Sequence, residues 1–105
     1  EAAWALANQG IRVCLYEMKP QRFSPAHHSE QFAELVCSNS LKARRLGSAA
    51  GMLKEEMRML GSLTVACAEA TSVAAGGALA VDRDAFSALV TKHIRAHALI
   101  EVVSG

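Results

Sequence analysis

The alternation of apolar and polar positions predicts a helix followed by a strand at the start of the chain. Residues 1–9 are rich in alanine, a strong helix former, and Gly10 follows where helices commonly end in a left-handed residue. In residues 11–17, IRVCLYE, apolar and polar side chains alternate with the period of a strand. Pro20 and Pro25 then indicate a loop. A helix followed directly by a strand is half of a βαβ unit.

The pattern of the middle of the chain, residues 23–81, predicts a largely helical excursion. Ser29 is a suitable N-cap for a short helix that carries Phe32, Leu35 and Val36 on one side. Residues 47–72 repeat apolar side chains at helical spacing, which predicts a long helix capped by Ser48 and bent at Gly61. Its methionines suit gap filling in a core, and they are Met52, Met57 and Met59.

The pattern at the end of the chain predicts one more helix and a strand. Asp82 is placed to cap a helix whose apolar face is formed by Phe86, Leu89, Val90, His93 and Ile94, with His93 partly buried. Residues 99–105, LIEVVSG, read as a short strand that returns beside the first strand, as in a long crossover.

These elements predict an α/β fold and a single domain fragment of three parts. Residues 1–22 form the helix and strand of a βαβ unit, residues 23–81 the mostly helical excursion, and residues 82–105 the helix and the returning strand. The opening helix has no N-cap before Glu1 and no preceding strand to pack on, so we expect the sequence to be a piece of a longer chain.

The amino-acid composition argues against several classes of protein. With 105 residues, 51% hydrophobic and 20% charged, the chain fits one globular domain or part of one. A net charge of +1 gives no general reason to expect nucleic-acid or membrane binding, and no apolar run approaches the ~20 residues of a membrane span. Three cysteines without C-x-x-C spacing argue against a disulfide framework or a zinc site, so the simplest reading is a reduced, cytoplasmic protein.

Glu17 ends the first predicted strand and is a candidate cofactor ligand. In dinucleotide-binding βαβ units an acidic residue at the end of the second strand bonds the ribose hydroxyls, about 20 residues after a Gly-rich turn. That turn would lie just ahead of Glu1. An ordinary strand-end carboxylate facing water is the alternative interpretation. His27 and His28 are adjacent without further ligands nearby, which favours a polar loop over a metal site.

Cys37 lies between an apolar run and Ser38-Asn39-Ser40. On the residues alone it is most simply a buried small hydrophobe, because free cysteine is among the most buried residue types. The alternative is a reactive thiol whose thiolate is stabilised by N–H groups of the turn. Ser40 could instead use the turn for local capping. Cys14 and Cys67 lack such a context and are interpreted as structural.

Four ordered blocks carry a family resemblance: EAAWALANQGIRVCLYEMKP, PAHHSEQFAELVCSNSLKA, GMLKEEMRMLGS and AGGALAVDRDAFSALVT. Together they resemble the N-terminal FAD-binding region of the folate- and FAD-dependent tRNA uracil-5 methyltransferases, relatives of the glucose-inhibited division protein A family. The blocks ELVCSNSL and GGALAVDR are more specific than a generic Rossmann pattern. Ala74 departs from the family, which usually has proline there.

The resemblance implies a partial Rossmann-like FAD-binding domain, whose first strand and Gly-rich turn lie ahead of Glu1. It implies methylation of uracil C5 in the tRNA T loop, with methylenetetrahydrofolate as carbon donor, reduced FAD, and NAD(P)H as co-substrate. Cys37 matches one of the family's two catalytic cysteines, as nucleophile or as acid–base partner. We expect this chain alone to bind FAD poorly, because the phosphate-binding turn lies outside it. The sister family that modifies the wobble uridine, and a non-catalytic α/β remnant, are the alternatives.

The same resemblance assigns further residues. Glu17 matches the acid that contacts the FAD ribose, and Gly76, Gly77 and Arg83 match a segment near the flavin or the substrate cleft. Arg83 would supply a fixed positive charge there, or it pairs with an acid as an ordinary first-turn residue. Lys42, Arg44 and Arg45 form a small basic cluster that could meet tRNA phosphates, with a solvated face as the commoner explanation.

Overall fold

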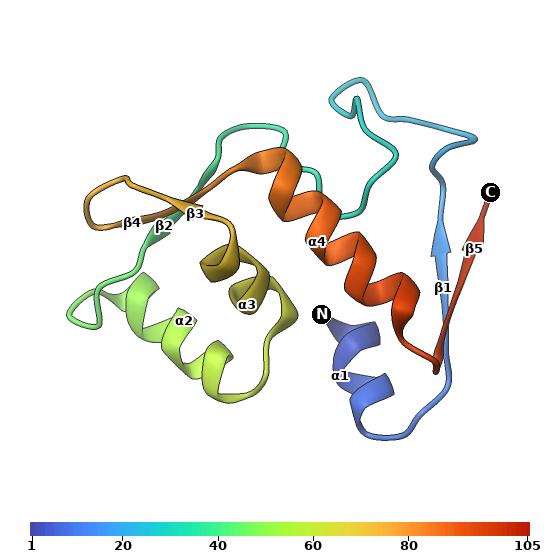
Figure 1. Ribbon diagram of the computed structural model, residues 1–105, viewed down its shortest axis with the longest axis horizontal. Helices are drawn as coiled ribbons and strands as arrows, with labels where there is room; N and C mark the ends of the chain where they lie inside the picture. The colour runs from blue at the N-terminus through green and yellow to red at the C-terminus, as the bar shows by residue number, and fades with distance from the viewer.

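The computed structural model describes all residues, 1–105, as four helices and five strands in two separate sheets (Figure 1). Along the chain they are α1 (Ala2–Asn8), β1 (Val13–Glu17), β2 (Ser40–Ala43), α2 (Ala49–Met59), α3 (Leu63–Ala70), β3 (Ser72–Val73), β4 (Ala78–Val81), α4 (Arg83–Ala96) and β5 (Ile100–Ser104). None of the helices is long and apolar enough to cross a membrane.

The first sheet joins the two ends of the chain. Strands β1 and β5 pair in parallel, with Val13 opposite Ile100 and Glu17 opposite Ser104. Figure 1 shows α1 and α4 beside this pair, with α4 leading the chain back to β5. The prediction of a helix and strand that return beside the first strand is therefore confirmed. The arrangement is a small α/β unit, which is compatible with part of an FAD-binding domain.

The second sheet was not predicted. Strands β2, β4 and β3 form an antiparallel three-stranded sheet in that order, so the description of residues 23–81 as mostly helical is wrong. The strands are two to four residues long, and β2 has an irregular register between Ser40 and Ala43. Such short strands carry too few alternating positions to show a strand period in the sequence.

The predicted short helix after Ser29 does not form. Ser29 Oγ accepts a hydrogen bond from the Gln31 N–H, and the Phe32 N–H donates to Thr91 Oγ1 on α4. The Lys19 ammonium group takes the carbonyl oxygens of Ser29 and Gln31 as acceptors. The carbonyl acceptors of Ser29 and Gln31, which a helix beginning at Ser29 would need, are thus used by Lys19, and Ala33 has a left-handed φ of 55°.

The predicted long helix over residues 47–72 is two helices. Gly61, at φ 80°, ends α2: its N–H donates to the Arg58 carbonyl, and the Ser62 N–H donates to the Met57 carbonyl. This pair of bonds is the Schellman arrangement, which stops a helix and does not bend it. Gly10 ends α1 at φ 84°, as predicted. The predicted Ser48 cap is confirmed, because its Oγ accepts from the Gly51 N–H.

The core lies where α3, α4 and β4 meet. Phe86, Val90 and Ile94 of α4 are buried against Leu63 and Cys67 of α3, with further members from the other elements: Ala7, Phe32, Ala68, Leu79, Val81 and Ile100. The predicted apolar face of α4 is confirmed except at His93, which is exposed and meets the Trp4 ring edge-on, with the ring centroids 5.7 Å apart.

Two of the α2 methionines were predicted wrongly. Met52 and Met59 are 47% and 73% exposed, so they do not fill gaps in the core. Within α2, Gly51 is buried, and the partly buried residues are Ala50, Lys54, Glu55 and Met57. Cys67 is 1% exposed, which confirms its structural interpretation, whereas Cys14 is exposed.

Candidate functional site

Cys37 and Arg83 line one groove although 46 positions separate them in the sequence (83 − 37 = 46). The groove has a volume of about 440 Å³ and is formed by the loop before β2 and the junction of β4 with α4. Its other lining residues are Ser38, Asn39, Val73, Val81 and Asp82. The small second sheet creates this site, because β2 and β4 pair and so place the cysteine loop beside the start of α4.

The loop that carries Cys37 is held at three points. Asn39 Nδ2 donates to the Val81 carbonyl over 3.1 Å, and the Val81 N–H donates to the Asn39 carbonyl over 2.9 Å. Upstream, Arg83 Nη1 donates to the Leu35 carbonyl over 3.3 Å. Ser38 Oγ accepts from the Ser40 N–H. The backbone on both sides of Cys37 is therefore fixed relative to α4.

The thiol of Cys37 is exposed and makes no hydrogen bond. The turn N–H groups do not reach its sulfur: that of Ser40 bonds Ser38 Oγ, and that of Lys42 bonds Ser40 Oγ. The local-capping interpretation of this turn is thus correct, and neither of these N–H groups bonds the Cys37 sulfur. The prediction from residues alone that Cys37 is buried is also wrong.

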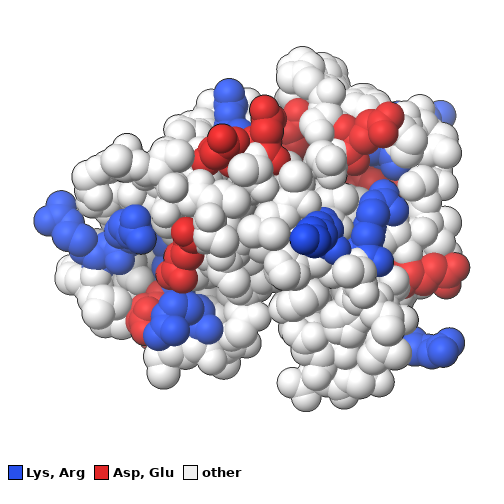
Figure 2. All heavy atoms as spheres, in the orientation of Figure 1, with Lys and Arg blue, Asp and Glu red and all other residues white.

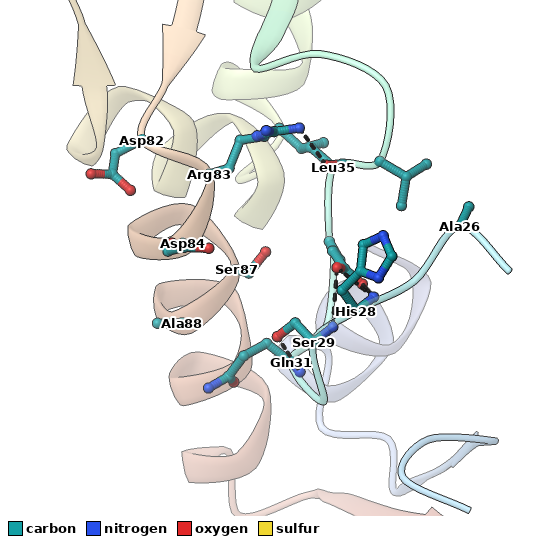
Figure 3. Close-up of a pocket in the computed structure, with 12 residues that line it drawn as sticks. Ala26, His28, Ser29, Gln31, Leu35, Asp82, Arg83, Asp84, Ser87 and Ala88 are labelled. Atoms are coloured by element: carbon teal, nitrogen blue, oxygen red, sulfur yellow. Dashed lines mark hydrogen bonds between the residues drawn. The ribbon is translucent and has the colours of Figure 1, made fainter. Parts of the chain in front are cut away.

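Arg83 lies at the start of α4 and forms no ion pair with an acid, so the first-turn pairing considered for it does not occur. Its guanidinium group borders the Cys37 groove and also a second, larger cleft of about 690 Å³. In Figure 3 the arginine reaches from α4 to Leu35 across the top of this cleft. His28 and Ser29 face Ser87 of α4 from the opposite side.

Two residues near this cleft escaped the sequence analysis. Glu34 accepts hydrogen bonds from the backbone N–H groups of His28 and Ser29, and Lys19 lies 3.9 Å from its carboxylate. Burial opposes ionisation of Glu34, but these hydrogen bonds and the Lys19 charge outweigh it and lower the pKa of the carboxyl. Lys19 is only 4% exposed.

Glu17 lies at the carboxyl end of β1 and lines neither cleft. Its Oε1 accepts from the Lys19 N–H over 3.0 Å, and its carbonyl accepts from the Gly105 N–H over 2.9 Å. The side chain is partly exposed, and its second carboxylate oxygen, Oε2, has no partner. An acceptor at this strand end is thus open to a ligand hydroxyl.

The two predicted glycines lie in the turn between β3 and β4, and neither lines the Cys37 groove. Gly76 has a φ of 60°, which only glycine adopts without strain. A Cβ on Gly77 would lie 2.9 Å from Arg45 Nε, so the close neighbour at this glycine is an arginine of the same chain. The backbone conformation therefore favours glycine at position 76, whereas at Gly77 the close neighbour is a flexible side chain that could move aside.

The histidine pair and the cysteines bring no metal-binding group together. No three His, Cys, Asp or Glu side chains lie close enough to hold a metal ion. His27 Nδ1 bonds Ser24 Oγ, and the N–H of His28 donates to Glu34. All three cysteines are free, and burial, followed by the nearby Glu1 charge, raises the pKa of the Cys67 thiol.

Comparison with known proteins finds a matching family model and several similar proteins. The model of the family described as "Glucose inhibited division protein A" matches residues 1–105. Proteins named methylenetetrahydrofolate--tRNA-(uracil-5-)-methyltransferase TrmFO are similar to the chain. The one from Acetivibrio thermocellus is 60% identical over 104 residues, 99% of this chain and 24% of the relative. The one from Geobacter sulfurreducens is 62% identical over 103 residues, 98% of this chain and 24% of the relative. The chain thus spans about a quarter of the length of these relatives.

Proposed function

The chain belongs to the glucose inhibited division protein A family, and we propose that it is part of a folate- and FAD-dependent tRNA uracil-5 methyltransferase. The proposal includes the T loop of tRNA as the place of methylation, methylenetetrahydrofolate as the carbon donor, NAD(P)H as the co-substrate and a cytoplasmic location. The names of relatives that are about 60% identical over nearly the whole chain support it.

The observation that carries the chemical part is the exposed Cys37 thiol beside Arg83 in one groove. Uracil C5 is a weak nucleophile until a group adds to C6. A thiolate suits that addition, because it is a good nucleophile and leaves again readily. The sulfur would bond C6, and C5 would then bond the donated methylene carbon. The bond from that carbon to the folate nitrogen would break and release tetrahydrofolate, and a base would remove the C5 proton before the thiolate leaves C6. Cys37 is proposed for either the nucleophile or the acid–base partner in this sequence.

Arg83 would act on the substrate in addition to holding the loop before Cys37. Its guanidinium group pairs with no acid and uses one N–H on the Leu35 carbonyl, so further N–H donors remain. A pyrimidine carbonyl oxygen gains negative charge when a thiolate adds to C6, and a fixed cation at the groove would stabilise it. We therefore assign Arg83 to charge stabilisation at this site.

The residues present also fit one part of FAD. The unpartnered Oε2 of Glu17, at the carboxyl end of a parallel strand, would accept a hydrogen bond from a ribose hydroxyl. Reduced flavin, when bound, supplies the electrons of the methylation. Gly76 and Gly77 were expected to allow close approach of the flavin, and this contact stays part of the proposal. The structure offers another reason for glycine at position 76, which is its positive φ, and Gly77 lies beside the Arg45 side chain. A Rossmann-like arrangement of the whole cofactor domain belongs to the same proposal.

The test replaces Cys37 with alanine in the complete enzyme and follows transfer of the methylene carbon into uracil of a tRNA transcript. We expect turnover to fall by about 10²-fold or more. Cys14→Ala is the matched control, because Cys14 is also exposed but lies on β1, outside the groove. Unchanged turnover in Cys37→Ala would rule out a catalytic thiol here. Product that carries the new carbon elsewhere than C5 of a T-loop uridine would instead favour the wobble-uridine family.

A further inference from the structure

Three cations gather at one edge of the molecule, at the end of β2 and just after it. Lys42, Arg44 and Arg45 are exposed, and none of them forms an ion pair with an acid. Figure 2 shows lysine and arginine atoms together at the left edge, where Figure 1 places β2 and the turn before β4. We refer to these three residues as the β2 basic edge.

The backbone beneath this edge is held on both sides. The Arg44 N–H donates to the Gly77 carbonyl over 3.0 Å, and the Arg45 carbonyl accepts from Ser48 Oγ over 2.8 Å. The Arg45 guanidinium group lies against Gly77, with its Nε 2.9 Å from where a Cβ would be. The Arg45 side chain is exposed and has no hydrogen-bond or ion-pair partner in the chain, so its N–H donors are free to meet an anion.

Resident acids do not neutralise the edge. Arg44 shares a shallow depression of about 260 Å³ with Lys54 of α2 and with Glu55 and Glu69. Glu55 is already paired with Arg58, whose Nε lies 2.8 Å from its carboxylate. No acid approaches Lys42, Arg44 or Arg45 within ion-pairing distance. The edge therefore keeps uncompensated positive charge on a chain whose net charge is only +1.

We propose that the β2 basic edge binds backbone phosphates of an RNA whose target base lies in the Cys37 groove. The inference rests on the proposed function. Strand β2 begins one residue after Asn39, which lines the groove, and leads directly to the cations. From Cys37 to Arg44 the chain spans at most about 25 Å, the length of a fully extended segment of this size. The backbone at Arg44 therefore lies no farther than about 25 Å from that at Cys37, so the groove and the edge are close enough for one folded RNA to contact both.

The test measures RNA binding of the complete enzyme that contains this chain by fluorescence anisotropy, with a labelled stem–loop that copies a tRNA T arm, over a series of salt concentrations. Neither FAD nor folate is added. The triple variant Lys42→Gln, Arg44→Gln, Arg45→Gln is expected to bind at least about tenfold more weakly, and its slope of log affinity against log salt should fall by roughly 2.

The matched control removes the same charge elsewhere: Arg12→Gln, Arg22→Gln and Lys92→Gln, all at exposed positions outside the edge. It is expected to stay within about twofold of the unmodified enzyme. Circular dichroism of both variants must match the unmodified enzyme. If the two variants lose affinity equally, or if the slope is unchanged, the proposal is overturned. Stronger binding to vesicles with anionic lipid than to RNA would also overturn it, in favour of a membrane surface.

The outcomes separate this inference from the proposed function. A lower salt slope in the triple variant, together with unchanged methyl transfer by Cys37→Ala, would sustain RNA binding and reject the catalytic thiol. An unchanged slope, together with lost turnover in Cys37→Ala, would reject the β2 basic edge and leave the catalytic proposal intact.

Discussion

Asn39 and Val81, 42 residues apart, exchange two hydrogen bonds, one through the asparagine side chain and one between backbones. The pair joins the loop after Cys37 to the last residue of β4. Since Arg83 follows Val81 by two positions, the same pair sets the distance between the two groups proposed for chemistry. The geometry of the groove therefore depends on a polar contact that lies beside the reacting groups.

Asn39→Ala should loosen the groove. The change leaves the Val81 carbonyl without its side-chain donor, so we expect a loss of about 1–2 kcal/mol in the free energy of unfolding. It is measured by urea denaturation. Ser38→Ala is the control, since Ser38 Oγ bonds only the exposed N–H of Ser40. If the two variants lost equal stability, the hydrogen bond between Asn39 and Val81 would contribute no more to stability than the local bond of Ser38.

Gly51→Ala should unfold the start of α2. A Cβ at Gly51 would lie 1.8 Å from the Arg45 carbonyl oxygen, and backbone atoms cannot move aside as a flexible side chain can. We expect a destabilisation of about 3 kcal/mol or more. Gly47→Ala is the matched control, because its Cβ would meet nothing within 4 Å. Thermal unfolding of both variants tests this prediction. If Gly51→Ala unfolded at the same temperature as Gly47→Ala, the loop before α2 would have to adapt to the added Cβ, and the prediction would be wrong.

Local signals in the sequence predicted the helix ends correctly. Gly10, Ser48 and Asp82 act within three residues of their own position, by a positive φ or by a side chain that accepts from a nearby N–H. The parallel return of β5 beside β1 followed from the order of helix and strand. The helix ends depend on neighbours in sequence, and the return of β5 depends on the order of the elements, both of which can be seen in a single sequence.

Features that depend on distant partners were not visible. Helical spacing after Ser29 was genuine, yet the distant Lys19 binds the carbonyl oxygens of Ser29 and Gln31 that a helix beginning there would need as acceptors. Gly61 correctly marked the position at which the helix is interrupted. The prediction was a bend, whereas the Schellman arrangement at Gly61 ends the helix. At Cys37 the usual burial of cysteine was a poor guide, since its exposure is set by the pairing of β2 with β4.

Glu34→Gln should make the free energy of unfolding depend less on pH in the acid range. The folded state lowers the Glu34 pKa, so the ionised carboxylate stabilises the fold at neutral pH. That contribution is lost as the pH falls below the ordinary value of 4.5 and through the folded pKa. We expect Glu34→Gln to be less stable at pH 7 and to lose less on acidification. Urea midpoints at several pH values test this, with the exposed Glu30→Gln as control. Parallel profiles for Glu34→Gln and the unmodified chain would contradict it.

The three thiols should differ in reactivity toward a neutral aromatic disulfide in the native chain. Cys14 and Cys37 are exposed and should react within seconds to minutes, whereas Cys67 is 1% exposed and should react only as fast as the fold opens. Burial also raises the Cys67 pKa, which lowers its thiolate fraction further. Absorbance of the released thiolate should therefore show two fast-reacting thiols in the native unmodified chain and one in native Cys37→Ser. In denaturant, all three thiols of the unmodified chain should react fast. Three fast groups in the native chain would mean that the contact of α3 with α4 opens readily, because Cys67 lies in that core.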